Sequence, residues 1–473
     1  MLRTIPELSD WPLPPRAGAG RSLDQAARHA VVELVNRNAA RLGTGRVDDA
    51  AAPLIFTGHQ AFFWHGGILA KDLCAAAAAA RCGGAAVHVV VDQDEHPATT
   101  LDVPATRGDA LEARTLTLAP QRPGLPTGAH PPVEWRLDAP ALPPRVAEAL
   151  TGLPPCRSLA EQVTVALHRL RSPYTAAPQG VVFASQLQQA PGFAALVERM
   201  RNDARACAQA YNSAAAETPE AGIAPLRLTR ELVELPLWTL RPGQPRRRVY
   251  ADVADSDALL VHEDGGAVTD DTDATLAPRA LTLTGFLRAG VADLFIHGTG
   301  GGVYDRVTES WWRRWRGEAL TPMVVATADL RLDFGVPVAS AADLARARWY
   351  RHHLPHNVDR YAHLRDGSRD EKRELLQAMG TTTDRARRAA LFHDLHRLNE
   401  QLVAAHPDLL AAADRQLQHA AAGVRNAAVA RRRDWSFALA PPQELRALAQ
   451  GAHAMVSPLP PGEGGESSSR VRA

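Results

Sequence analysis

The sequence of 473 residues contains few lysine, cysteine and aromatic residues, and its charges almost cancel. Lys and Arg together number 53 and Asp and Glu 52, which gives a formal net charge of +1. This balance provides no long-range field for nucleic acid or an anionic membrane, so we expect neither as a partner. The four cysteines lie far apart, without the two-residue spacing that is typical of a zinc ribbon or a redox pair.

Long uncharged apolar segments are also absent. No stretch reaches the roughly 18 apolar residues that a membrane-spanning helix requires. The first residues lack an apolar stretch of signal-peptide length, and we therefore expect a cytoplasmic, reduced protein. The chain is longer than one hydrophobic core usually organises, so we expect two domains or a core with a large appendage.

The segment 53–96 has the pattern of a βαβ unit. A short apolar run ends in Thr57-Gly58-His59-Gln60, a helix begins near Gly66-Gly67, and a second apolar run, 87–91, ends in acidic residues. Continuous apolar runs predict parallel strands that are covered on both faces. Ligands of open α/β sheets bind beyond the carboxyl ends of the strands. We therefore expect the turn after the first strand and the residues 92–96 after the second to line one crevice.

Lysine usage singles out one residue of that crevice. Only two of the 53 basic residues are lysines, Lys71 and Lys372, so this sequence uses arginine where charge alone is needed. Lys71 lies near the start of the crevice helix, which predicts a compact ammonium group that contacts phosphate. A solvated surface lysine is the alternative.

A second strand, glycine loop and helix follow at 292–316. Glycines at this point let backbone N–H groups approach an anion at a helix N-terminus, although a purely structural tight turn fits the same residues. The residues of interest are His297, Gly298, Gly300, Gly301 and Tyr304.

From about 341 to 433, glycine and proline become rare, and charged residues alternate with Leu and Ala. Leucines from Leu391 to Leu409 keep a four-three spacing, which is the seam of a short coiled coil and needs a partner helix. Part of this seam can close within one chain, and we expect a homodimer through the arm to cover the rest. The predicted organisation is an α/β core over 1–335, a helical coiled-coil arm over 336–433, a return to the core over 434–457 and a disordered tail over 458–473.

These motifs resemble the bacillithiol-biosynthesis cysteine-adding enzyme family (BshC). Thr57-Gly58-His59-Gln60 is similar to that family's Thr-Gly-Gln-Gln turn, and Asp94-Glu95-His96 is similar to its Glu-Asp-His. The strand that leads into His297-Gly298-Thr299-Gly300 is similar to the one before its Gly-Gly-Pro-Gly loop, with Tyr304 matching its tyrosine. The departures are His59 for Gln, Gly67 for Pro and Gly301 for Glu.

The resemblance implies a Rossmann-like, doubly wound parallel sheet with a dimerising helical coiled-coil appendage. It also implies a ligase that adds cysteine to the amine of glucosaminyl-malate. The leading hypothesis is therefore an enzyme that binds ATP, ADP or another nucleotide and joins an amino acid to an amine. No metal is predicted for this reaction.

The candidate base is His96, with Asp94 as its orienting partner, because a histidine in a polar crevice accepts protons near neutral pH. We expect His65 and Lys71 on the phosphates and the loop glycines as backbone donors. The candidate cofactor-binding residues are Thr57, Gly58, His59, Gln60, His65, Gly66, Gly67, Lys71, His297, Gly298, Gly300, Gly301 and Tyr304.

Two alternatives remain open. Asp92, Asp94 and His96 alternate along a strand end and so share a face, which fits metal-assisted hydrolysis. The same acids also fit loop caps or pairs with arginine. The second alternative is a non-catalytic scaffold whose helical arm recruits partners.

Overall fold

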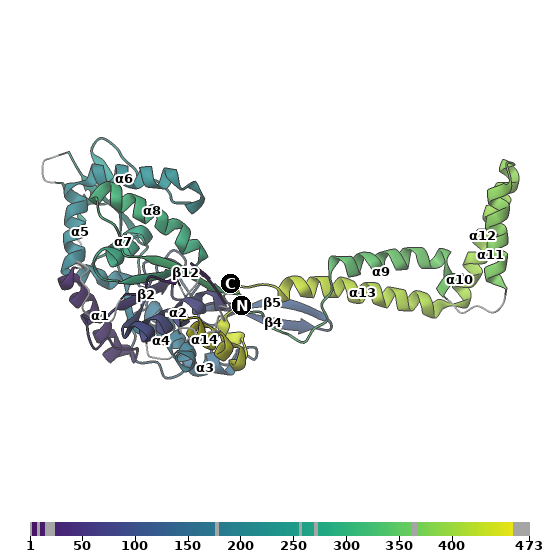
Figure 1. The fold of residues 1–473 in the computed structure, drawn as a ribbon, viewed down its shortest axis with the longest axis horizontal. Helices are drawn as coiled ribbons and strands as arrows, with labels where there is room; N and C mark the ends of the chain where they lie inside the picture. Colours follow the sequence, from purple (N-terminus) through teal and green to yellow (C-terminus); the bar gives the residue numbers. More distant parts are fainter. Residues whose placement is uncertain are drawn as a thin grey trace, which may run out of the picture. The chain divides into compact units, whose positions relative to one another are not determined.

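The computed structural model describes residues 2–6, 10–14, 24–175, 179–254, 258–268, 273–361 and 367–456 (Figure 1). The predicted tail over 458–473 lies outside these residues. The protein is of the mixed α/β class. The chain divides into two compact units, which we call the core unit (1–103, 115–330 and 433–473) and the helical unit (104–114 and 331–432).

A six-stranded sheet forms the centre of the core unit, in the order β1-β12-β11-β2-β3-β6. The pairs from β12 through β6 are parallel, and β1 pairs antiparallel with β12 at the edge. The strands are β1 (Leu2–Ile5), β2 (Leu54–His59), β3 (Ala85–Val90), β6 (Gly180–Phe183), β11 (Leu294–His297) and β12 (Met323–Ala328).

Helices cover both faces of this sheet, which explains the continuous apolar runs in its strands. Leu54 and Phe56 of β2 belong to a buried cluster with side chains of α1 (Gln25–Leu42), α7 (Ala280–Gly290) and α8 (Thr299–Arg316). Successive strand residues point to opposite faces, so Ile55 and Thr57 face the other side. There α2 (Gly66–Cys82) packs on β2, β3 and β12.

The order of the strands reverses between β2 and β11. From β2 the chain adds β3 and then β6 on one side, whereas the later strands β11 and β12 lie on the other. In open α/β sheets such a reversal leaves a crevice outside the carboxyl ends of the two central strands. The turns after His59 and His297 lie at this crevice.

The remaining elements of the core unit surround the sheet. A four-stranded antiparallel sheet has the order β10-β7-β8-β9. Its strands are β7 (Leu232–Leu240), β8 (Arg247–Asp252), β9 (Leu259–Val261) and β10 (Thr275–Pro278). The other helices are α3 (Pro144–Leu150), α4 (Leu159–Arg171), α5 (Pro191–Asn202), α6 (Ala204–Glu217) and α14 (Pro442–Val456), the last of which packs on α2.

Two pairs of helices and the short helix α10 form most of the described part of the helical unit. In Figure 1, α9 runs alongside α13 and α11 alongside α12, and the same pairs are in contact. Its small core joins Val358, Leu398 and Leu402. Its helices are α9 (Ala341–His353), α10 (Val358–Tyr361), α11 (Ser368–Thr381), α12 (Arg385–Ala405) and α13 (Pro407–Ala430).

One boundary of the sequence-based organisation needs correction. Strands β4 (Thr100–Arg107) and β5 (Ala110–Thr117) form a hairpin, and its outer part, 104–114, groups with the helices. The cause is Asn426 of α13, which is fully buried. Its side chain accepts from the Leu111 N–H at 2.8 Å and donates to the Asp109 carbonyl at 2.7 Å.

Among the described helices, none has the length and apolar character that a membrane-spanning segment requires.

Candidate functional site

A pocket of about 610 Å³ lies at the carboxyl ends of β2 and β11, entirely within the core unit. It brings together most of the residues that the two glycine motifs predicted, although they come from distant parts of the chain. The predicted residues that line it are Gly58, His59, Gln60, His65, Gly67, Lys71, Asp94, His297, Gly298, Gly300, Gly301 and Tyr304. Thr57, Gly66 and His96 are not part of this lining.

The glycine of the first turn is required by a close approach of two strands. A Cβ atom at Gly58 would lie 2.3 Å from Cγ1 of Val89 and 2.6 Å from the Val89 carbonyl oxygen. Because the second contact is with backbone, a side chain here would force β2 and β3 apart. Thr57 is fully buried beneath the turn, where its hydroxyl donates to the Ile296 carbonyl at 2.9 Å and ties β2 to β11.

His65 has a structural role that the sequence did not predict. It is the N-cap of α2, and its Nδ1 accepts a hydrogen bond from the Gly67 N–H at 3.0 Å. Burial, with help from Arg433 and Lys71, lowers the pKa of His65, which favours the neutral ring that this cap requires. Since Nδ1 is engaged, only the other ring nitrogen can face a ligand.

Lys71 is buried, with 3% of its surface exposed, so the alternative of a solvated surface lysine is wrong. Its Nζ donates to the Gly58 carbonyl at 2.6 Å, and its Cδ lies 3.7 Å from the point that a Cβ of Gly298 would occupy. Burial lowers the pKa of Lys71 to about 8, against a raising effect of Asp72. Among the described residues, no carboxylate forms an ion pair with this ammonium group. The Asp72 carboxylate instead contacts His88 and Arg171.

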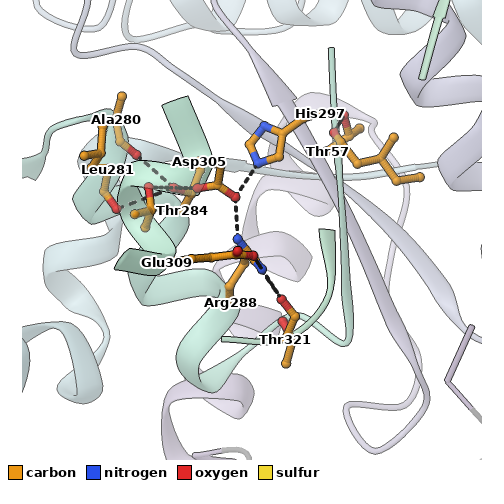
Figure 2. A network of polar contacts seen from close by, with 11 residues as sticks. Thr57, Ala280, Leu281, Thr284, Arg288, His297, Asp305, Glu309 and Thr321 are labelled. Atoms are coloured by element: carbon orange, nitrogen blue, oxygen red, sulfur yellow. Dashed lines mark hydrogen bonds and ion pairs between the residues drawn. The ribbon is translucent and has the colours of Figure 1, made fainter. Parts of the chain in front are cut away.

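The end of β11 carries a buried charge network that the sequence analysis did not identify (Figure 2). His297 Nε2 lies 2.8 Å from Oδ2 of Asp305 in α8, and the two side chains are 4% and 0% exposed. Arg288 of α7 donates to the same oxygen at 2.6 Å, and the Thr284 hydroxyl donates to Oδ1 at 2.7 Å. Every oxygen of the Asp305 carboxylate is therefore occupied by a donor.

These donors control the charge of Asp305. Burial alone would raise its pKa, but His297, Arg288 and Thr284 hold the pKa well below its usual range. The carboxylate therefore stays ionised inside the protein. The sequence signal for this pair was weak, because a histidine that ends a strand and an aspartate eight residues later are common separately.

The polar residues after β3 do not gather in the same way. Asp92 accepts from the Ser185 N–H at 2.9 Å and from its hydroxyl at 2.5 Å, and burial raises its pKa to about 6. Asp94 faces the pocket but pairs with Arg246 and accepts from the Gln60 amide at 3.2 Å.

The imidazole of His96 packs on Phe62, with ring centroids 4.1 Å apart. In the part of the chain that the structure describes, His96 and Asp94 share no hydrogen bond, so the expected pair of base and orienter does not form there. Nor do three His, Cys, Asp or Glu side chains of the described residues converge as metal ligands.

The pocket suits an anionic ligand. The N-termini of two long helices, α2 and α8, both reach it. The N-cap of α8, Gly298, offers no side-chain cap, so the N–H groups of the first helical turn remain available. Lys71 adds positive charge, and Arg433, which pairs with Asp329, lines the same pocket. Helix N-termini and a buried ammonium group together form a site of the kind that binds phosphate.

Histidine and tyrosine side chains supply further polar groups. His59 has a buried Nδ1 without a hydrogen-bond partner in the described structure, and burial followed by Lys71 lowers its pKa well below the usual value. Burial also raises the pKa of Tyr304, whose hydroxyl therefore remains a donor at neutral pH. Both side chains line the pocket.

A comparison with protein-family models finds no match for this chain, and a comparison with curated proteins finds none either.

Proposed function

We propose that the protein is an enzyme that binds a nucleotide or a similar phosphate-bearing ligand and joins an amino acid to the amine of a small acceptor. The observation that carries this proposal is the convergence of two helix N-termini and the buried ammonium group of Lys71 on one pocket. Burying a lysine without a carboxylate partner is costly, and an anion would supply that partner.

The proposal requires the amino acid carboxylate to become electrophilic. A nucleoside triphosphate achieves this by forming an acyl phosphate or an acyl adenylate, whose negative charge the helix N-termini and Lys71 would hold. The amine then attacks the acyl carbon and must lose a proton. The cysteines do not suit a covalent route, because burial raises the pKa of Cys74 to about 12 and that of Cys156 to about 11.

The resemblance stated above narrows the proposal to a cysteine-like amino acid and a sugar-derived amine such as glucosaminyl-malate. It also suggests a Rossmann-like core, which fits the reversal of strand order at the pocket. The two alternatives have less support. The acids after β3 face different partners, which does not favour a metal-dependent hydrolase. A scaffold would need no open pocket at the glycine turns.

We further propose a cytoplasmic homodimer that forms through a coiled coil of the helical unit. Leu398 and Leu402 are buried within that unit, so this part of the leucine seam closes within one chain. Phe392 on the same helix is 48% exposed. Phe392→Glu should therefore produce monomers in light scattering with unchanged helix content, whereas a dimer that persists would contradict a dimer contact at this residue.

The binding step can be tested by thermal denaturation with ATP, ADP, cysteine or glucosaminyl-malate. A ligand at about 100 times its dissociation constant stabilises a protein by roughly 2.7 kcal/mol. We expect ATP or ADP to raise the Tm and Lys71→Met to remove that shift. Lys372→Met is the matched control, because it replaces the other lysine, which pairs with Asp359 in the helical unit. It should change the Tm but keep the nucleotide-dependent shift.

The chemical step can be tested by mass spectrometry of a mixture of protein, ATP, cysteine and glucosaminyl-malate. An ATP-dependent amide product is expected. The absence of a Tm shift with every nucleotide, together with no amide, would contradict the proposed function.

A further inference from the structure

We propose that His297 is the general base of this reaction, that Asp305 positions it, and that the missing side chain of Gly301 keeps its reactive nitrogen open. This inference rests on the proposed function, because it assigns the proton transfer in the amine attack. It replaces His96 by a residue that the sequence analysis had placed among the ligand contacts.

Asp305 determines which imidazole nitrogen of His297 carries the proton. Nε2 of His297 faces an ionised carboxylate whose other contacts are all donors. A carboxylate only accepts, so Nε2 carries a hydrogen and the neutral ring has its lone pair on Nδ1. This is the way in which an acidic neighbour selects the tautomer of a catalytic histidine.

Nδ1 of His297 points towards Gly301. A Cβ atom at Gly301 would lie only 2.7 Å from Nδ1 of His297, and 3.2 Å from two other atoms of that side chain. At Gly300, one position earlier in the same turn, a Cβ would meet nothing within 4 Å. Both glycines and His297 line the pocket. A side chain at position 301 would therefore cover the lone pair on Nδ1 of His297.

The His297 ring is held rigidly by its surroundings. Nearly all of the His297 side chain is buried, and its ring stacks on Phe295 with centroids 4.5 Å apart. Tyr304 packs against it at 5.7 Å. Asp305 is itself fixed by Arg288 and by Thr284, which come from α7. A base that is held in place before the substrate arrives does not need to be oriented during the reaction.

The other histidines near the crevice are less suitable. Nδ1 of His65 accepts from the Gly67 N–H as a helix cap, so no carboxylate holds that nitrogen. His96 is outside the pocket lining. His59 also lacks a carboxylate partner among the described residues. Among the described histidines that line the pocket, His297 is the one whose ring combines a buried carboxylate partner with an open nitrogen.

The proposed step conserves atoms and charge. The amine nitrogen of the acceptor attacks the acyl carbon of an acyl phosphate or acyl adenylate, and an N–C bond forms. The bond between the acyl carbon and the oxygen that links it to phosphorus breaks. Its electron pair leaves on that oxygen with the phosphate or the nucleoside monophosphate. The proton of the attacking nitrogen moves to Nδ1 of His297, and the imidazolium that forms is stabilised by Asp305.

His297→Gln tests this assignment with little risk to the fold, because the glutamine amide nitrogen can still donate to Asp305 while the basic nitrogen is lost. Two activities are measured with ATP and cysteine. One is amide formation with glucosaminyl-malate, and the other is hydroxamate formation with hydroxylamine, which is already unprotonated at neutral pH. ATP binding is measured in parallel by calorimetry.

We expect the variant to lose amide formation by about 100- to 10,000-fold and to keep ATP binding and hydroxamate formation within a few-fold. Retention of amide formation would overturn the assignment. Loss of both products would also overturn it, because His297 would then act in activation and not as the base. If the parent protein binds no nucleotide and forms no hydroxamate, the proposed function itself fails.

Gly301→Ala gives a second test that leaves residue 297 a histidine. Its methyl group would lie 2.7 Å from Nδ1 of His297, so it must cover that nitrogen or displace the ring. Alanine favours a helix, and circular dichroism checks that the fold is kept. The added methyl group should lower amide formation at least tenfold and leave ATP binding in place. For the positioning role of Asp305, Thr284→Val removes one of its donors, and we expect kcat to fall several-fold with KM unchanged. Unchanged kcat in both variants would contradict the proposed arrangement.

Discussion

The strands β3 and β11 lie on either side of β2 in the central sheet, and both are followed by polar residues that behave differently. After β3, Asp92, Asp94 and His96 alternate in the sequence, but they contact Ser185, Arg246 and Phe62 respectively. After β11, His297 and Asp305 lie eight residues apart, and they meet in one buried network.

The difference teaches that neighbouring polar residues do not form a cluster merely because they are close in sequence. In an extended chain, successive side chains point in opposite directions, and the irregular segment after β3 disperses its residues further. Because α8 begins directly after β11, the second turn of α8 lies beside the end of the strand, and this places Asp305 next to His297. The predictions below compare these two regions, beginning with the largest expected effect.

Removal of an acid should destabilise the protein much more at the β11 end. Asp305→Ala removes the buried carboxylate partner of Arg288 and leaves it the partly exposed Glu309, and breaking a buried pair costs about 3–5 kcal/mol. Asp94→Ala removes a partner of Arg246 from a pair that is about one third exposed, and such pairs contribute about 0–1 kcal/mol. Urea unfolding of both variants measures the free energies, and equal losses would contradict the comparison.

Lys71, which lies between the two ends, should reduce stability at neutral pH. Its folded pKa of about 8 is below the ordinary value of 10.5, so the cost of burying the charge is fully present below about pH 8. That cost declines as the pH rises towards 10.5. Lys71→Met should therefore stabilise the free protein by about 2 kcal/mol at pH 7, after loss of one hydrogen bond. The gain should shrink at pH 9.5, and a pH-independent gain would refute this account.

Asp92→Asn should have a smaller effect of the same kind. Burial raises the folded pKa of Asp92 to about 6, above its ordinary value of 3.8, so its contribution to stability is lost as the pH rises through 6. The amide retains an acceptor for the Ser185 N–H. We expect a gain of about 1 kcal/mol at pH 7.5 and none at pH 3.5. Loss of activity in this variant, with activity that depends on added Zn²⁺ or Mn²⁺ in the parent, would favour the hydrolase instead.

His96→Ala should have the smallest effect. Because the ring packs on Phe62 outside the pocket lining, we expect the rate of amide formation to fall less than tenfold. A loss of about 100- to 10,000-fold, as expected for a general base, would return that role to the β3 end. Steady-state kinetics of this variant beside His297→Gln decides between the two ends.

The location of the pocket could be predicted from sequence because it depends on local patterns. Apolar runs before Gly58 and before His297 indicated buried strands, and glycines after them indicated where a helix N-terminus could approach a ligand. Parallel strands present their carboxyl ends at one edge, so the two motifs were expected to meet. The rarity of lysine also drew attention to Lys71.

The chemistry within the pocket was harder to predict, because it depends on contacts between elements. Asp305 is significant only because Arg288 and Thr284 of another helix approach it. The N-cap role of His65 was not predicted, because a histidine N-cap has no distinctive spacing. Arg433 lies far along the chain, and nothing near it in sequence marks it as part of the pocket.

One wall of the pocket is made late during synthesis. Arg433 lines the pocket and donates to Thr327 at 3.1 Å, and the Phe437 N–H donates to the Trp64 carbonyl at 2.7 Å, beside the cap of α2. These residues leave the ribosome only after all of 331–432. While 331–432 are being synthesised, the segment that completes the surroundings of β2, α2, β11 and α8 is therefore still absent. Domains usually fold as units as they emerge, but this core unit must wait for its last segment.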